Sequence, residues 1–93
     1  MTATIKQMIS EECDLLKKTL LKKNEEYGNS AIEPIRIFSS ADNMEQINVR
    51  IDDKLSRIKN KNDKEIKEDT ELDLAGYLIL KRVAKKRNGN GRF

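Results

Sequence analysis

The chain has 93 residues, with 19 basic and 16 acidic side chains, one cysteine, and neither histidine nor tryptophan. This length allows one small domain with a thin hydrophobic core, and the composition excludes an internal disulfide, a Ser-His-Asp triad and a conventional Zn²⁺ site. No bilayer-spanning apolar run and no signal peptide is visible, so we expect a cytoplasmic protein without membrane contact.

The first element in chain order is a helix expected over residues 4–26, followed by a loop over residues 28–41. Apolar side chains recur at helical spacing on one stripe: Ile5, Ile9, Leu16 and Leu20. Gly28 is expected to end the helix, because glycine adopts backbone conformations that other residues avoid. The loop carries four large apolar residues, Ile32, Ile35, Ile37 and Phe38, so we expect it to pack against the helices.

Two further helices are expected after the loop. Asp42 and Glu45 have the spacing of a capping box, which predicts a second helix running to about Lys59. Its expected buried stripe consists of Met44, Ile47, Ile51, Leu55 and Ile58. The third helix is expected from about Glu65 to Arg87, and a disordered basic tail is expected over residues 88–93.

These elements predict an all-α protein: one three-helix domain over residues 1–87, with a long packed loop between its first two helices. Because three short helices bury little apolar surface, we also expect a homo-oligomer in which contacts between copies bury more.

Charged residues interrupt the apolar faces of all three helices. Lys54 falls inside the stripe of the second helix, Asp69 and Asp73 share one face of the third, and Glu12 lies at the edge of the first stripe. A charge in such a position is costly without a partner. In a structural interpretation, Lys54 pairs with Asp69 or Asp73 and joins the two helices. In a functional interpretation, the carboxylates bind Mg²⁺ and the cations bind phosphate.

The end of the first helix and the second helix together offer the groups that a phosphorylated nucleotide needs. The predicted nucleotide-binding residues are Lys23, Asn24, Tyr27, Gly28, Asn29, Ser30, Arg50, Lys54 and Arg57. The four cations suit phosphate, Tyr27 can stack on a base, and the two asparagines and the serine can bond to the base edge or sugar. Two alternatives stay open: Tyr27 can close the helix end by packing, and Arg50 and Arg57 can form surface ion pairs.

Three separated motifs carry a family resemblance. They are Lys23-Asn24-x-x-Tyr27-Gly28-x-Ser30, Arg50-x-x-Asp53-Lys54-x-x-Arg57 and Glu68-Asp69-x-x-x-Asp73-Leu74-x-Gly76-Tyr77. In this order they resemble small phage proteins of the nucleotide-modification-associated type, which are similar to the MazG-like all-α nucleoside triphosphate pyrophosphohydrolases. The resemblance covers about residues 20–82. It implies a helical, oligomeric, nucleotide-handling protein in the cytoplasm of a phage host.

The same resemblance defines a candidate metal site. MazG-like enzymes coordinate Mg²⁺ with a Glu-Glu-x-x-Glu box and a Glu-x-x-Asp box. In this chain the first box is Glu11-Glu12-x-x-Leu15, which lacks its last carboxylate. The second is Thr70-x-x-Asp73, which lacks its leading glutamate, although Asp69 stands next to it. The two missing carboxylates weaken the expectation of hydrolysis more than the expectation of nucleotide binding.

Three functions are therefore expected, in order. The first is binding and sequestration of a phosphorylated nucleotide, cyclic or not, that a host uses as a defence signal; it needs no cofactor. The second is Mg²⁺-dependent pyrophosphate hydrolysis with Glu12, Asp69 and Asp73 as metal ligands and a bound water as nucleophile. The third is a helical adaptor that binds a host protein or nucleic acid through its basic tail, although such charge runs are more often solvated helix faces than nucleic-acid surfaces.

Overall fold

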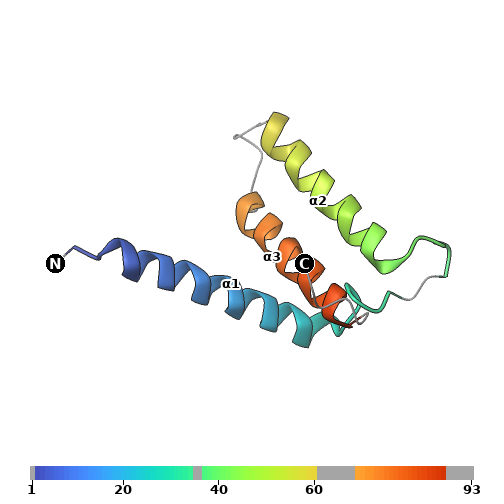
Figure 1. Cartoon of the computed structure of the whole chain (residues 1–93), viewed down its shortest axis with the longest axis horizontal. Helices are drawn as coiled ribbons and strands as arrows, with labels where there is room; N and C mark the ends of the chain where they lie inside the picture. The colour runs from blue at the N-terminus through green and yellow to red at the C-terminus, as the bar shows by residue number, and fades with distance from the viewer. Residues whose placement is uncertain (1, 35–36, 61–68, 88–93) are drawn as a thin grey trace.

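The computed structural model describes residues 2–34, 37–60 and 69–87, which contain three helices (Figure 1). They are α1 (Ile5–Tyr27), α2 (Asn43–Asn60) and α3 (Thr70–Arg87). The described part of the chain contains no strand, so the all-α, three-helix prediction is confirmed. The ends of α1 and α2 and the C-terminal end of α3 lie within one residue of their expected places, but the expected start of the third helix near Glu65 is wrong, because α3 begins at Thr70 and Asp69 caps it. The expected helical residues 65–68 and the expected tail over residues 88–93 lie outside the described residues. None of these helices combines the length and apolarity needed to cross a membrane.

Each helix begins at a residue whose side chain accepts a hydrogen bond from the first helical turn. Thr4 and Gln7 form a reciprocal capping box, with bonds of 3.1 and 2.7 Å. Asp42 Oδ1 accepts a 2.8 Å bond from the backbone N–H of Glu45, which confirms the expected start of α2. Asp69 caps α3 in the same way at 3.0 Å.

The core lies between α2 and α3, which run antiparallel to each other (Figure 1). Ile47 of α2 is 3% exposed, and Ala84 of α3 is fully buried. The expected α2 stripe is only partly covered, because Leu55 and Ile58 are 49% and 39% exposed. The prediction that these two are buried is wrong: among the described elements only α3 packs on α2, and a single neighbour covers a narrow arc of a helix surface.

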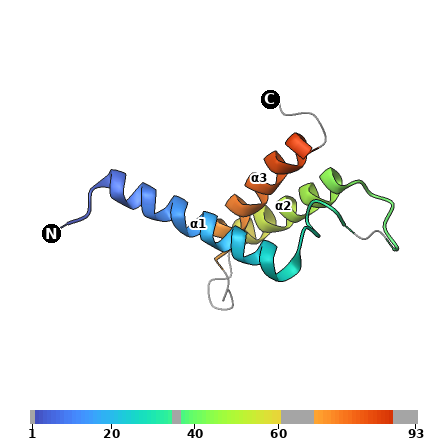
Figure 2. The same cartoon turned by 90° about the horizontal axis from the view of Figure 1, so that it is seen from below.

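The apolar face of α1 is covered along only part of its length. Its C-terminal half packs against α3, where Leu20 approaches Gly76 closely. Ile5 and Ile9 are 69% and 59% exposed, because the N-terminal half projects beyond the other helices (Figures 1 and 2). The radius of gyration of 15.4 Å reflects this shape, since a compact chain of this length has about 12 Å.

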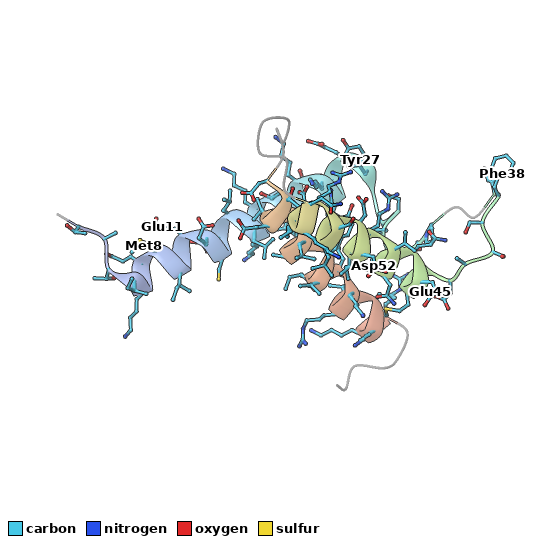
Figure 3. The ribbon with its side chains drawn as sticks, turned by 90° about the horizontal axis from the view of Figure 1, so that it is seen from above. Met8, Glu11, Tyr27, Phe38, Glu45 and Asp52 are labelled. Atoms are coloured by element: carbon cyan, nitrogen blue, oxygen red, sulfur yellow. The ribbon has the colours of Figure 1, made fainter. Side chains whose placement is uncertain are left out.

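The loop between α1 and α2 packs only at its beginning. Ile32 is half-buried, and its carbonyl accepts a 2.8 Å hydrogen bond from the side chain of Asn43. Ile37 is 69% exposed and Phe38 is fully exposed at the outer tip of the loop (Figure 3), so the packed-loop prediction is wrong for both. The loop runs away from the helices there, and nothing in the described chain covers these side chains. Ile35 lies outside the described residues.

Candidate functional site

A pocket of about 330 Å³ lies where the C-terminal half of α1, the following turn and the N-terminal half of α3 meet. Its apolar lining comes from Leu16, Leu20, Ala31, Ile32, Leu72, Gly76 and Leu80. Its polar and aromatic lining comes from Thr19, Lys23, Asn24, Tyr27, Gly28, Asn29, Ser30, Asp73 and Tyr77. An apolar cavity with a few convergent polar groups is the usual form of a small-molecule site.

Six of the nine predicted nucleotide-binding residues line this pocket. They are Lys23, Asn24, Tyr27, Gly28, Asn29 and Ser30. The other three, Arg50, Lys54 and Arg57, lie on α2, which does not line it. The structure therefore brings together the first of the three sequence motifs and part of the third.

The turn that follows α1 has a specific shape, set by Gly28 and by hydrogen bonds around it. Gly28 has φ 64° and ψ −150°, a backbone conformation found almost only in glycine. The side chain of Asn24 donates to the Gly28 carbonyl at 3.1 Å and to Asn29 Oδ1 at 2.8 Å. The amide of Asn29 donates in turn to Glu33 at 3.2 Å. Consequently, the pocket wall is held in shape without a ligand.

Two tyrosines contribute to the pocket from different helices. Tyr27, labelled in Figure 3, is 69% exposed at the end of α1, so it buries too little surface to close the helix end by packing. Tyr77 is half-buried on α3. The sequence reasoning did not assign Tyr77 to the site, although it stands in the third motif, directly after Gly76.

Asp73, one of the residues that line the pocket, forms ion pairs with two lysines. Asp73 lies 3.4 Å from the ammonium of Lys54 and 3.7 Å from that of Lys23. The side chains of Lys54 and Asp73 are only 10% and 19% exposed. They form the ion pair between α2 and α3 that the structural interpretation predicts.

The remaining predicted cations lie on the surface of α2. Arg57 forms an ion pair with Asp53 at 3.3 Å, one turn earlier on the same helix, and both side chains are about half exposed. Arg50 is exposed. The predicted contacts of Arg50 and Arg57 with phosphate remain predictions.

The three candidate metal ligands are not brought together. Glu12 is exposed on α1, Asp69 caps α3, and Asp73 pairs with two lysines. Within residues 2–34, 37–60 and 69–87, no cluster of three or more acidic or cysteine side chains could hold a metal ion. These residues do not fit a Mg²⁺ site, and no step through a metal follows from them.

Comparison of the chain with protein-family models, with curated proteins and with solved structures gives no match.

Proposed function

We propose that the pocket between α1 and α3 binds a phosphorylated nucleotide and that the protein sequesters it without chemical change. The observation that carries this proposal is the pocket lining: two tyrosines, two asparagines, a serine and a lysine converge on one cavity. Aromatic rings suit a nucleobase, side-chain amides suit its hydrogen-bonding edge, and an ammonium suits a phosphate.

Lys23 is the group best placed to bind phosphate. Its side chain is 56% exposed and lies 3.7 Å from Asp73, a separation at which a solvated ion pair contributes little stability. A phosphate can therefore take Lys23 away from Asp73 at small cost, because Lys54 still neutralises that carboxylate. In this proposal Tyr27 stacks on the base, and Asn24 and Ser30 bond to the base or sugar.

The size of the pocket limits what one copy can hold. A volume of about 330 Å³ is at the lower end of the range for small-molecule sites, so we expect it to accept one nucleoside unit. A dinucleotide or cyclic oligonucleotide has to extend beyond it. The proposal includes a homo-oligomer, which the exposed apolar face of α1 favours and in which a second copy can cover the rest of a longer ligand.

The resemblance to small phage proteins of the nucleotide-modification-associated type supports a biological role for such binding. A protein of this kind in the cytoplasm of an infected host removes a nucleotide signal of the host's defence from solution. Sequestration needs affinity and copy number, and it needs no metal or catalytic base.

The test is a thermal-shift screen of the full chain against mononucleotides, linear dinucleotides and cyclic oligonucleotides, with and without Mg²⁺. We expect a rise in Tm that does not need Mg²⁺, followed by recovery of the intact ligand from heated complex, analysed by chromatography. Appearance of a hydrolysis product that depends on Mg²⁺ contradicts sequestration and favours a pyrophosphohydrolase. A screen without any shift contradicts nucleotide binding and favours an adaptor.

Variants then locate the site. Tyr27→Ala and Lys23→Ala should each weaken binding at least about tenfold, since each removes a stacking or charge-assisted contact. Glu25→Ala, on the opposite face of α1, is the matched control and should bind like the parent protein. Arg50→Ala and Arg57→Ala provide a separate test, because a loss of affinity would extend the phosphate site from the pocket onto α2.

A further inference from the structure

The N-terminal half of α1 presents an apolar face that no other described residue of the chain covers. Leu16 and Leu20 of this face pack on α3, but the same face continues outward through Ile5 and Ile9, which lie within about 20° of Leu16 around the helix. Met8 and Leu15 border it and are 42% and 44% exposed. Figure 3 shows Met8 on the part of α1 that projects away from α2 and α3.

A second surface with exposed apolar side chains lies on α3. Its apolar residues are Leu78, Ile79 and Val83, which are 47%, 40% and 44% exposed. At 100° per residue, Arg82 and Lys86 fall on the same side of α3 as these residues. The buried residues Thr70 and Ala84 fall on the other side of α3, whereas Gly76, which approaches Leu20 of α1, lies about 20° from Val83 at the edge of the surface.

The two surfaces carry opposite charge. At 100° per residue, Arg82 and Lys86 lie on the α3 surface, whereas Glu11 and Asp14 fall on the opposite side of α1 from Leu16 and do not belong to its apolar face. Glu12 lies within the apolar face of α1, about 40° from Leu16, and it is exposed in the single copy. Arg82 and Lys86 offer Glu12 the opposite charge, so charge favours α3 as the partner surface.

A single copy cannot make this contact within itself. α1 is one continuous helix from Ile5 to Tyr27, and its C-terminal half is already packed on α3 beside Gly76. The N-terminal half therefore projects away from its own α3 (Figures 1 and 2).

We infer that the N-terminal half of α1 packs on the exposed surface of α3 in a second copy of this chain. Ile5, Met8 and Ile9 then cover Leu78, Ile79 and Val83, and Glu12 faces Arg82 and Lys86. This inference rests on the homo-oligomer included in the proposed function and names the two surfaces that form it. Because the surfaces differ, the contact is either reciprocal between two copies or head-to-tail, and a head-to-tail contact forms a ring if it closes and a filament if it does not.

Cys13 allows the contact to be tested in the unmodified protein, because it is the only cysteine, it is exposed, and it lies close to Glu12. An equal mixture of unlabelled and ¹⁵N-labelled protein is treated with a linker that joins a thiol to an amine. Mass spectrometry should then find mixed-isotope crosslinks from Cys13 to Lys81, Lys85 or Lys86. Crosslinks only within one isotope, or only to lysines of α1, overturn the inference.

Charge reversal gives an independent reading by light scattering, without any nucleotide. Glu12→Lys and Lys86→Glu should each raise the dissociation constant of the assembly by about 100-fold, because each places like charges in contact. Combining the two should restore the parent mass. Lys18→Glu, on the opposite face of α1, is the control and should leave the mass unchanged.

A folded Glu12→Lys protein that keeps its assembled mass overturns the inference, and so does a double variant that stays dissociated. Circular dichroism checks that each variant is helical. The mass of the assembly is measured without nucleotide. The result therefore tests this contact even if the protein does not bind nucleotides.

Discussion

The ammonium of Lys54 lies 3.4 Å from the carboxylate of Asp73, inside the contact between α2 and α3. Lys54 is 8% exposed and occupies the middle of a stripe that also carries the core residue Ile47. The pair therefore takes a place that an apolar pair would fill in a simpler helix hairpin. Asp73 also lines the pocket, so the group that joins two helices is one wall of the candidate site.

Removing one member of this pair should be costly. Asp73→Asn should lower the free energy of unfolding by about 2 kcal/mol, because a largely buried ammonium loses its ion pair with this carboxylate, while the remaining exposure of Asp73 keeps the loss below that of a fully buried pair. Urea unfolding followed by circular dichroism measures this. Lys54→Met/Asp73→Leu should recover part of the loss, and a double variant less stable than either single one contradicts this account.

The backbone at Gly28 should not tolerate a side chain. Nothing lies within 4 Å of a Cβ added at this position, so Gly28→Ala creates no clash with another residue. Its positive φ alone should make the variant less stable by about 1–3 kcal/mol. Glu26→Ala, one residue inside the helix, is the control in the same urea experiment. A Gly28→Ala protein as stable as this control would mean that the turn adopts another conformation.

Two substitutions at Gly76 should distinguish the effect of filling the pocket from the effect of changing the packing of α1 on α3. A Cβ there would lie 3.1 Å from Leu20 Cδ2, the flexible end of a side chain, so Leu20 can move aside. The gain in helix propensity should keep Gly76→Ala within about 0.5 kcal/mol of the parent in stability. Gly76→Leu should fill the pocket and reduce nucleotide affinity at least about tenfold. Isothermal titration of both variants checks this, and undiminished binding by Gly76→Leu would place the ligand elsewhere.

Asp69 should act as a helix cap. Its carboxylate accepts a 3.0 Å bond from the backbone N–H of Leu72, so Asp69→Ala should make the protein less stable by about 1 kcal/mol. Asp69→Asn keeps an acceptor oxygen and should be nearly neutral. If Asp69→Asn instead removes a Mg²⁺-dependent change in Tm that the parent protein shows, the residue is a metal ligand.

The hydroxyl of Thr70 should be dispensable. Thr70 is 8% exposed, and its oxygen is buried without a hydrogen-bond partner among the described residues. Thr70→Val keeps the shape and removes the unsatisfied group, so it should raise the free energy of unfolding by about 1 kcal/mol. Thr70→Ser keeps the hydroxyl and is the comparison. A Thr70→Val protein less stable than the Thr70→Ser protein would show that the oxygen has a partner in solution.

The helices were predictable because their signals are local. The cap at Asp42, the stop at Gly28 and the 3.6-residue periodicity each act within a few residues. Asp69, which was expected inside the third helix, caps α3 instead. The sequence could also predict that Lys54 needs a carboxylate, because an unpaired charge cannot stay on an apolar face. It could not choose between Asp69 and Asp73, since that choice depends on the register of α2 against α3.

The extent of burial was not predictable from the same pattern. Ile5 and Ile9 have the same spacing as Leu16 and Leu20, yet only the second pair contacts α3. Periodicity shows which side of a helix is apolar, but it does not show how far a neighbour extends along it. Only part of the pocket lining was predictable. The residues from Lys23 to Ser30 are close together in sequence, whereas Tyr77 lines the pocket only because α1 packs on α3.

The turn at Gly28 also has an evolutionary consequence. Its path is held by the conformation of one glycine and by the bond from Asn24 to a backbone carbonyl. Neither depends on the side chains of Ser30 or Ala31, which face the same cavity. Substitutions at these two positions can therefore change the shape and polarity of the pocket while the turn itself stays intact. For the proposed sequestration of host nucleotides, this arrangement lets single mutations alter ligand choice without refolding the site.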